Sequence, residues 1–231
     1  MPGTADASSL ATIPLFDGLT SEELMRLNGL LHRATFPAGR PLMTAEQPGE
    51  VAYIILSGTV KVHVEQANGG DVILGIRGPG EILGEMSLLD NASRSATVET
   101  LEEARLLWID RLAFQACLKT MPALAYNLLG ILARRLRLAT VQIQVLATQD
   151  LYGRVAYQLL AFADTYGETR PNGDVLIRLT LTQSDLASLV GASRARVNQV
   201  LGFYKQRSYI SVDQDTHITV HNRPALAQRC Q

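Results

Sequence analysis

The sequence predicts an α+β protein built from an antiparallel β jelly roll, a long helix and a C-terminal winged helix-turn-helix unit. Three observations predict this order. Apolar and polar residues alternate between about 36 and 110, which is the period of half-buried strands. Apolar residues then recur every three or four positions between about 122 and 149, and two short helix patterns joined by a glycine follow. We therefore expect three parts, at 1–120, 121–149 and 150–231.

The first part combines a short helix with closely spaced strands. Thr20–Leu24 is typical of a capped helix start, and the apolar face of this helix consists of Leu24, Leu27, Leu30 and Leu31. Val60–Glu65 alternates apolar and polar residues, and Gly69-Gly70 between two apolar runs predicts a hairpin. Glycines recur about every ten residues here, a spacing that favours an antiparallel sandwich or jelly roll.

Residues 122–149 carry a heptad pattern that begins at Pro122, a residue suited to the first turn of a helix. Its seam consists of Ala125, Leu129, Leu132, Leu136, Ala139, Ile143 and Leu146. A second apolar stripe consists of Leu128, Ile131, Leu138 and Val145. Because a helix with two apolar faces needs two surfaces to cover it, we assign the seam to a second copy of the chain and the stripe to the chain's own β domain. The alternative is a helix buried within a monomer.

The third part begins with a helix whose apolar face consists of Leu151, Val155, Leu159 and Phe162. A turn at Gly167–Gly173 and a short strand at Ile177–Leu179 follow. Thr182–Asp185 resembles a capping box, Gly191 ends that helix, and Ser193 is a good N-cap for the next one. Inward positions of the two helices are Leu186, Leu189, Val190, Val197, Val200 and Leu201. Two helices joined in this way predict a helix-turn-helix, and Ile210–Val212 with Ile218–Val220 predict its wing.

Polar side chains suited to DNA lie on the outward face of the second short helix. They are Arg194, Arg196, Asn198 and Gln199, with Ala195 among them. Arg, Asn and Gln can bind base edges through two hydrogen bonds, and Ser193 can hold a phosphate. Residues 152–231 carry a formal charge of +3 and the rest of the chain −4, which favours a polyanionic partner for the C-terminal part. The alternative is an ordinary helical hairpin with a solvated face, although arginines in the first helical turn argue against it.

The β domain contains a second motif with the features of an anion site. Gly84-Glu85 predicts the start of a short helix whose backbone N–H groups face an anion. Arg94 can add charge and Ser95 a hydrogen bond, while Glu85 can accept hydrogen bonds from a sugar hydroxyl. These residues predict a pocket for a phosphate and a ribose. The alternative is an ion pair between Glu85 and Arg94 that closes a loop.

Three paired motifs resemble the Crp–Fnr family of bacterial transcription regulators over nearly the full chain. They are Gly84–Glu85 with Arg94–Val98, Ala133–Leu136 with Gly153–Ala156, and Leu181–Thr182 with Leu189–Arg194. The resemblance implies a homodimer with a cyclic-nucleotide-binding jelly roll, a long dimerisation helix and a winged helix-turn-helix. It implies a ligand site formed by Gly84, Glu85, Met86, Ser87, Arg94, Ser95, Ala139 and Thr140. It implies DNA contacts from Thr182, Gln183, Ser193, Arg194, Arg196, Asn198 and Gln199.

The resemblance also implies the ligand, the partners and two departures. Cyclic AMP is the expected ligand, and the family contacts RNA polymerase through the turn that corresponds to Glu168–Asp174. Ala139 and Thr140 replace the threonine–serine pair that contacts adenine in the cyclic-AMP receptor. This change leaves room for cyclic di-GMP, and a third possibility is a regulator that is active without ligand. Ala195 and Gln199 replace a glutamate and an arginine, so we expect operator half-sites that differ from those of that receptor.

Composition excludes several other classes of protein. No apolar run reaches the ~20 residues of a membrane span, and Met1–Leu10 does not resemble a secretory signal, so we expect a cytoplasmic protein without a membrane partner. Two cysteines are too few for an iron–sulfur cluster or a zinc site. The intact Gly84-Glu85 motif argues against haem. An enzyme is not expected, because His32 and His63 lack partners at metal-ligand spacing and His63 reads as a surface or edge residue.

Overall fold

The computed structural model describes residues 10–66, 70–214 and 216–230, which form two compact units. The first unit comprises the chain up to Glu65 together with Leu74–Leu136, and the second comprises Gln66–Ile73 together with the chain from Arg137 onward. The division therefore falls inside the long helix α5 (Pro122–Thr148) rather than at its end. The three domain boundaries expected from the sequence stay predictions.

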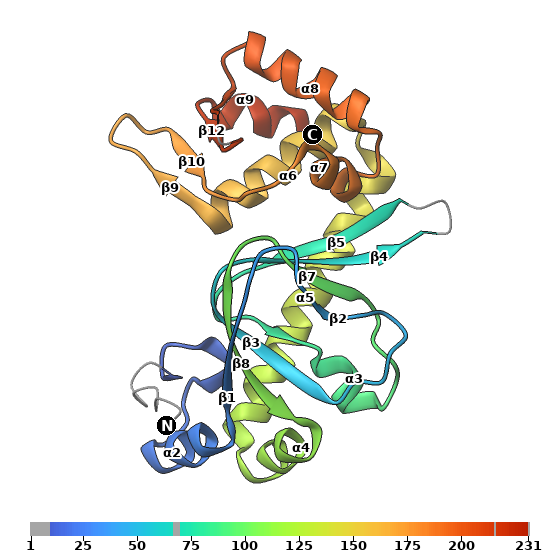
Figure 1. Cartoon of the computed structure of the whole chain (residues 1–231). Coiled ribbons are helices and arrows are strands. Elements are labelled where there is room, and N and C mark those ends of the chain that lie inside the picture. The colour runs from blue at the N-terminus through green and yellow to red at the C-terminus, as the bar shows by residue number, and fades with distance from the viewer. Residues whose placement is uncertain (1–9, 67–69, 215, 231) are drawn as a thin grey trace. The chain divides into compact units, whose positions relative to one another are not determined.

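Two antiparallel four-stranded sheets form the jelly roll (Figure 1). The first has the order β1-β8-β3-β6, with bounds His32–Phe36, Ala104–Asp110, Val51–Ser57 and Ile82–Leu83. The second has the order β2-β7-β4-β5, with bounds Pro41–Met43, Thr97–Thr100, Val60–Glu65 and Asp71–Arg77. Neighbouring residues Ile54 and Ile55 of β3 are both fully buried, and they belong to two different apolar clusters of the core. The predicted fold class is confirmed.

Short helices surround the roll. They are η1 (Pro14–Phe16), α2 (Ser21–Leu30), α3 (Glu85–Asp90) and α4 (Arg111–Thr120). The capping box predicted for α2 is present, because the Thr20 hydroxyl accepts a hydrogen bond from Glu23 N and the Glu23 carboxylate accepts one from Thr20 N. Leu24 and Leu27 of α2 are buried in the same apolar cluster as Leu107 and Phe114. The helix start at Gly84-Glu85 is also as predicted.

Two expectations for β4 have different outcomes. His63 is 3% exposed, so its prediction as a surface or edge residue is wrong. The reason is that β4 lies between β7 and β5 in its sheet and is therefore not an edge strand, with His63 paired opposite Thr97. The hairpin predicted at Gly69-Gly70 falls partly outside the described residues. On the described side, Gln66 N donates to Gly70 O where β4 leads to β5.

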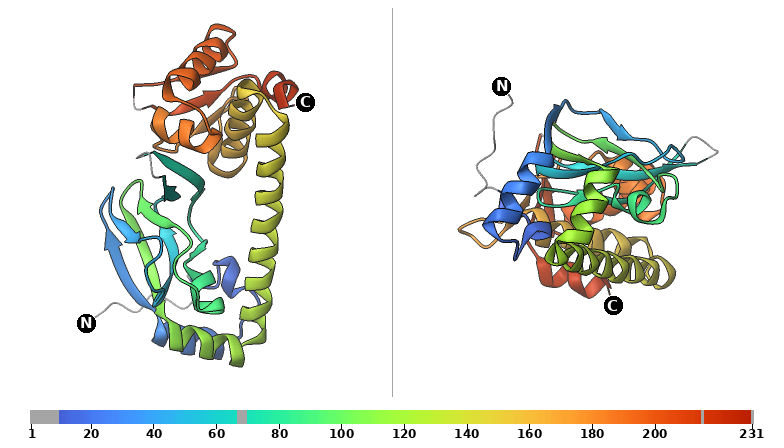
Figure 2. Two further views of the ribbon diagram at one scale, coloured as in Figure 1. Left: turned by 90° about the vertical axis from the view of Figure 1, so that its right-hand side faces the viewer. Right: turned by 90° about the horizontal axis from the view of Figure 1, so that it is seen from below.

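Helix α5 runs without a break for 27 residues, or about 40 Å (Figure 2). Leu124 and Leu128 are buried in the core of the first unit, and Ile131 and Leu132 pack against it. Other apolar side chains of α5 with large exposed fractions are Tyr126, Leu129, Leu136, Leu138, Val141, Ile143 and Leu146. The assignment of the second stripe to the β domain therefore holds for Leu128 and Ile131, and it stays a prediction for Leu138 and Val145, which belong to the second unit. A helix buried throughout within one chain is not what the structure shows.

The second unit contains a helical core and a small sheet (Figure 1). Its helices are α6 (Leu151–Tyr166), α7 (Gln183–Val190), α8 (Arg194–Gln206), α9 (Arg223–Ala227) and η2 (Gln228–Cys230). Its sheet has the order β11-β12-β10-β9, with bounds Ile210–Val212, Ile218–Val220, Val175–Ile177 and Gly167–Thr169. All four residues of the predicted α6 face are buried, and the two wing strands have the predicted bounds.

The hairpin before the helix-turn-helix differs from its sequence-based prediction. Gly167–Thr169, predicted as turn, is strand β9, and the turn itself is closed by a hydrogen bond from Gly173 N to Arg170 O. The strand predicted at Ile177–Leu179 is β10, which ends at Ile177. It ends there because Ile177 pairs with the first residue of β9 and the first residue of β12, so the next residue has no strand partner.

Among the described residues, no single helix combines the length and hydropathy needed to cross a bilayer. Only α4 and α5 taken together meet that test, and they are bent by 108° at the break between them.

Candidate ligand-binding and DNA-binding sites

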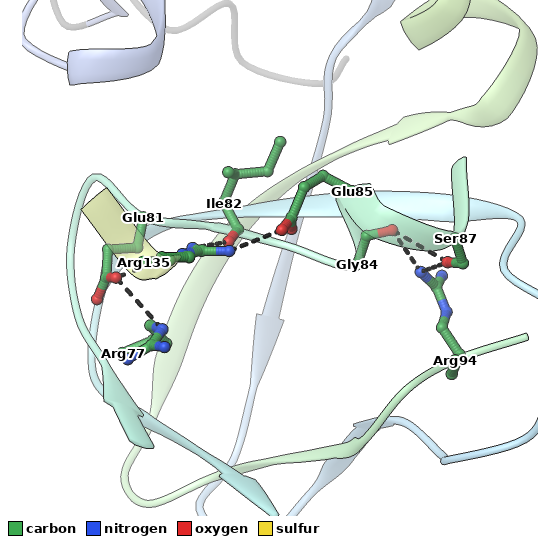
Figure 3. Close-up of polar contacts among 8 residues, drawn as sticks. All are labelled: Arg77, Glu81, Ile82, Gly84, Glu85, Ser87, Arg94 and Arg135. Atoms are coloured by element: carbon green, nitrogen blue, oxygen red, sulfur yellow. Dashed lines mark hydrogen bonds and ion pairs between the residues drawn. The ribbon is translucent and has the colours of Figure 1, made fainter. Parts of the chain in front are cut away.

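Arg94 is the centre of the candidate ligand site. Its side chain is 6% exposed and donates hydrogen bonds to three acceptors within the first unit, of which Gly84 and Ser87 are drawn in Figure 3. Nη1 lies 2.7 Å from Gly84 O and 2.8 Å from Ser87 Oγ, while Nη2 lies 2.6 Å from Val51 O. The guanidinium is therefore held in position by the start of α3 and by strand β3.

Glycines allow this close packing around the guanidinium. A Cβ at Gly49 would lie 2.1 Å from Ser87 Oγ, and a Cβ at Gly84 would lie 2.4 Å from Arg94 Nη1. Gly84 also has a φ of +76°, in the left-handed region that other residues rarely adopt. Substitution of Gly84 would displace the Arg94 side chain, and substitution of Gly49 would displace Ser87, which accepts a hydrogen bond from Arg94.

Burial has an electrostatic consequence for Arg94. Removal of the guanidinium from water lowers its pKa, and the neighbouring Arg111 lowers it further, while Tyr53 and Glu85 act in the opposite direction. A bound phosphate would supply a negative charge that favours the charged form of Arg94. The electrostatic surroundings of this side chain therefore favour an anion.

Glu85 is held by Arg135 of α5 and not by Arg94. The Glu85 carboxylate is 2% exposed, and its Oε1 accepts a hydrogen bond of 2.7 Å from Arg135 Nη1 (Figure 3). Arg135 also donates to Ile82 O and lies 3.9 Å from the carboxylate of Glu81. The alternative of a Glu85–Arg94 ion pair is therefore replaced by a Glu85–Arg135 pair. The sequence motif contained Arg135 but gave it no role, since its partner lies 50 residues away.

The other predicted ligand residues have varied surroundings. We call the segment from Gly84 to Ser95 the nucleotide cassette. Within it, Ser87 is buried and donates to Gly84 O, while Met86 and Ser95 are exposed. The structure thus brings Gly84, Glu85, Ser87 and Arg94 together. Ala139 and Thr140 are exposed on the part of α5 that belongs to the second unit. Their contact with a ligand stays a prediction.

The helix-turn-helix is built by local hydrogen bonds. Thr182 and Asp185 form the predicted capping box of α7, and Gly191 ends α7 with a φ of +65°. The Ser193 hydroxyl accepts a hydrogen bond from Arg196 N and caps α8. The six inward positions predicted from the sequence are all buried. Both helices begin at a residue whose side chain caps them, so the sequence determines at which residue each helix starts.

The candidate DNA-reading face of α8 is open to solvent. Arg194, Arg196, Asn198 and Gln199 are exposed, as is Ser193 at the cap. Thr182 is exposed and Gln183 is half-buried at the start of α7. All seven predicted DNA contacts therefore lie on α7, α8 or their caps, and their roles stay predictions.

One residue that the sequence analysis did not assign supports this unit. Arg154 Nε donates to Gln149 O at 3.1 Å, and its Nη1 donates to Val190 O at 3.3 Å. Arg154 thereby connects the residue after α5 to the last residue of α7. The sequence could have pointed to Arg154, because this residue belongs to the family motif Gly153–Ala156.

Two domain families match the chain. The cyclic nucleotide-binding domain matches residues 33–121, and the Crp-like helix-turn-helix domain matches residues 153–229. The first match contains Arg94 with its partners, and the second contains α7 and α8. The two regions identified from geometry therefore coincide with the two matched domains.

Similar proteins match over most of the chain. A CRP-like cAMP-activated global transcriptional regulator of Mycobacterium tuberculosis is 33% identical over 222 residues, which cover 96% of this chain and 98% of that protein. A cyclic AMP receptor protein of Thermus thermophilus is 35% identical over 188 residues, which cover 81% and 83%. The solved structure of the c-di-GMP responsive regulator CLP of Xanthomonas campestris has a TM-score of 0.75 at 23% identity, covering 88% and 100%. An identity this low shows a shared fold alone.

Proposed function

The chain belongs to the Crp–Fnr family of transcription regulators, and on this premise we propose that it is a homodimer whose affinity for DNA is raised by cyclic AMP. It is a DNA-binding transcription regulator with a cyclic nucleotide-binding domain. This family consists of regulators rather than enzymes. The observation that carries the proposal is the buried Arg94, held ready for an anion beside a helix start.

Cyclic AMP is supported as the ligand by the cassette and by the relatives. A cyclic phosphate at the α3 N-terminus would accept hydrogen bonds from Arg94 and Ser95, with Glu85 positioned for a ribose hydroxyl. The two relatives at 33% and 35% identity are named for cyclic AMP. The one observation that favours cyclic di-GMP is the loss of a hydroxyl at Ala139. No contact among the described residues favours activity without a ligand.

The proposed coupling begins at the Glu85–Arg135 pair. A ribose hydroxyl that binds Glu85 competes for the carboxylate that Arg135 holds at 2.7 Å. Because Arg135 lies on α5, a change at the nucleotide changes the contacts of the long helix, whose C-terminal end leads to α6. Such coupling works only if the ligand binds the two arrangements of the helix with different affinity, and it is typically worth about 1–3 kcal/mol.

Dimerisation is supported by the exposed seam of α5. Leu129, Leu136 and Ile143 repeat every seven residues, and Leu136 is 70% exposed in the single chain. A row of exposed leucines and isoleucines at heptad spacing favours a parallel partner helix. A dimer would present two α8 helices to successive major grooves, about 34 Å apart. We expect Leu136→Asp to give a monomer in sedimentation, while Arg137→Asp serves as a matched exposed control.

Operator recognition and activation are further parts of the proposal. Arg194 is expected to bind guanine and Gln199 to favour adenine, so selection from random DNA should return half-sites unlike those of the cyclic-AMP receptor. Recovery of that receptor's own half-site would contradict this assignment. The turn between β9 and β10, within Glu168–Asp174, is the candidate contact for RNA polymerase.

Titration calorimetry with cyclic AMP tests the proposed ligand. The wild-type chain should bind with saturable heat, and Arg94→Leu should abolish that heat. Arg105→Leu is the matched control, because Arg105 is exposed on the same roll and its side chain donates to Ser57 Oγ, its one hydrogen bond among the described side-chain contacts. If cyclic di-GMP binds and cyclic AMP does not, the proposed ligand is wrong but the family assignment stands. No binding of either, combined with tight operator binding, would support activity without ligand.

A further inference from the structure

Arg135 of α5 lies between two carboxylates of the roll, and the coupling described above uses only one of them (Figure 3). Its Nη1 is 2.7 Å from Glu85 Oε1, whereas its Nη2 is 3.9 Å from Glu81 Oε1. Among the described residues, these are the two carboxylates within 4 Å of the Arg135 guanidinium, and all three residues belong to the first unit. Glu81 is therefore the acceptor to which Arg135 can turn when another donor engages Glu85.

Glu81 is itself held in place where the chain passes from β5 to β6. Its Oε2 accepts a hydrogen bond of 2.8 Å from Gly78 N, and its Oε1 lies 3.4 Å from Arg77 Nε. The contact with Arg77 uses the same oxygen that faces Arg135 (Figure 3). Because two cations that approach one oxygen repel each other, Arg77 weakens the attraction between Glu81 and Arg135.

The hydrogen bonds of Arg135 are incomplete in the present arrangement. Its Nε is buried, and no acceptor in the described part of the chain lies within hydrogen-bond distance of it. A buried donor without a partner costs free energy, so the arrangement around Glu85 is favoured by less than its other contacts suggest. A shift of about 1 Å would bring Nη2 within ordinary hydrogen-bond distance of Glu81 Oε1.

We propose that Glu81 is a positioning residue for the response to the nucleotide, which binds Arg135 when a ribose hydroxyl binds Glu85. This inference rests on the proposed function and deepens it by naming the second partner of Arg135. A hydroxyl that donates to Glu85 weakens the bond between Glu85 and Arg135, and the guanidinium then moves toward Glu81. Arg77 opposes this exchange because it contacts the same oxygen. Helix α5 thus has two alternative ion pairs with the roll, and the nucleotide favours the second.

The exchange predicts changes in affinity that are opposite to those expected from charge alone. Glu81→Gln removes a negative charge from the roll, and charge alone would then tighten the binding of an anionic ligand. The exchange predicts weaker binding instead, because Arg135 loses its second partner and the arrangement that binds the nucleotide becomes rarer. Arg77→Gln removes a positive charge, which by itself would weaken binding, whereas the exchange predicts tighter binding.

Titration calorimetry with cyclic AMP on the full chain, without DNA, measures both effects. We expect Glu81→Gln to weaken binding about threefold and Arg77→Gln to tighten it about threefold. Glutamine keeps an acceptor for Gly78 N, so the turn is retained. Glu99→Gln is the matched control, because Glu99 pairs with Lys61 at 3.4 Å on the same roll and its side chain is 31% exposed, against 36% for Glu81. This control should bind cyclic AMP as the wild type does.

The two variants overturn the exchange in separate ways. Binding by Glu81→Gln that equals or exceeds that of the wild type would contradict it, and so would binding by Arg77→Gln that is not tighter. Thermal unfolding shows whether each variant folds. Should Glu81→Gln not fold, Arg77→Gln decides the question alone, because a merely structural role of this ion pair does not predict tighter binding.

Operator titration without nucleotide is the second readout. Arg77→Gln should bind the operator about threefold more tightly than the wild type, since more of the protein has Arg135 on Glu81. Equal operator affinity of the two proteins would overturn the exchange. A wild-type chain that binds its operator but no cyclic AMP would contradict the proposed function instead, and the operator affinity of Arg77→Gln would still test the exchange.

Discussion

The nucleotide cassette and the DNA-reading face of α8 use arginine in opposite ways. Arg94 is 6% exposed and all its described hydrogen bonds go to the protein, at 2.6–2.8 Å. Arg194 is exposed at the first turn of α8, and the Ser193 cap positions the backbone there rather than the side chain. The Arg94 side chain is thus fixed by hydrogen bonds to the protein, whereas the structure gives the exposed Arg194 side chain no such described partner.

This difference separates stability from function in the two sites. Substitution of a buried cassette residue such as Arg94 should remove proposed ligand contacts and leave buried groups without partners, so it should cost folding free energy as well as affinity. Substitution of an exposed α8 side chain such as Arg194 should remove only the contacts that we propose with DNA. The two sites should therefore respond differently to the same kind of mutation, and four experiments test how far that contrast extends.

The largest effect is expected for Arg135→Leu. The Glu85 carboxylate, 2% exposed, would lose its only described cationic partner, and breaking a buried ion pair typically costs about 3–5 kcal/mol. Denaturant unfolding measures this loss. The neighbouring Arg134 is exposed, so Arg134→Leu should change stability by no more than about 0.5 kcal/mol. Equal stability of the two variants would show that the cassette does not depend on its buried pair.

The direct contrast is Arg94→Leu against Arg194→Leu. The first leaves Val51 O, Gly84 O and Ser87 Oγ without their donor, which should cost about 2 kcal/mol of unfolding free energy. The second should lie within about 0.5 kcal/mol of wild type while it lowers operator affinity. Unfolding curves and operator titrations on both proteins separate the outcomes, and equal loss of stability would remove the distinction between the sites.

Two serines sharpen the comparison on a smaller scale. Ser193→Ala removes the cap of α8 and should cost about 1 kcal/mol. Ser95 is exposed in the cassette, so Ser95→Ala should leave the unfolding free energy nearly unchanged while it weakens cyclic AMP binding. Thermal unfolding and calorimetry check both. A destabilised Ser95→Ala protein would mean that this hydroxyl supports the fold rather than the ligand.

The smallest effect is a pH dependence at the wing. A hydrogen bond from His221, whose Nδ1 lies 2.8 Å from Asp174 Oδ2, lowers the pKa of Asp174 below its usual value. Because the folded pKa is lowered, this stabilisation is present above about pH 3.9 and is lost as the pH falls through the folded pKa. The difference in stability between wild type and Asp174→Asn should therefore shrink on acidification below that pH. A difference that grows in acid would contradict the assigned sign.

Features built by neighbouring residues were predictable from the sequence. The capping boxes at Thr20 and Thr182, the Ser193 cap and the wing strands each depend on residues within a few positions of one another. Their chemistry is local, so composition and spacing were enough. The exposed and inward positions of α8 follow from the same helical period.

Features that depend on distant parts of the chain were not predictable in this way. Glu85 meets Arg135 across 50 residues, and Arg94 meets Val51 across 43. His63 has the spacing of a surface residue, but a neighbouring strand on each side places it inside a sheet. On α5, heptad spacing identified a row of apolar residues but did not show that Leu132 of this row packs against the core of the β domain, whereas Leu136 is exposed.

Operator affinity measured with and without saturating cyclic AMP, in wild type and Arg94→Leu, tests the central claim most directly. The account predicts that the nucleotide tightens binding of the wild type to its selected operator by about 5–150-fold and leaves Arg94→Leu unchanged. Wild-type affinity that is the same with and without the nucleotide, under conditions where calorimetry shows the nucleotide bound, would contradict it.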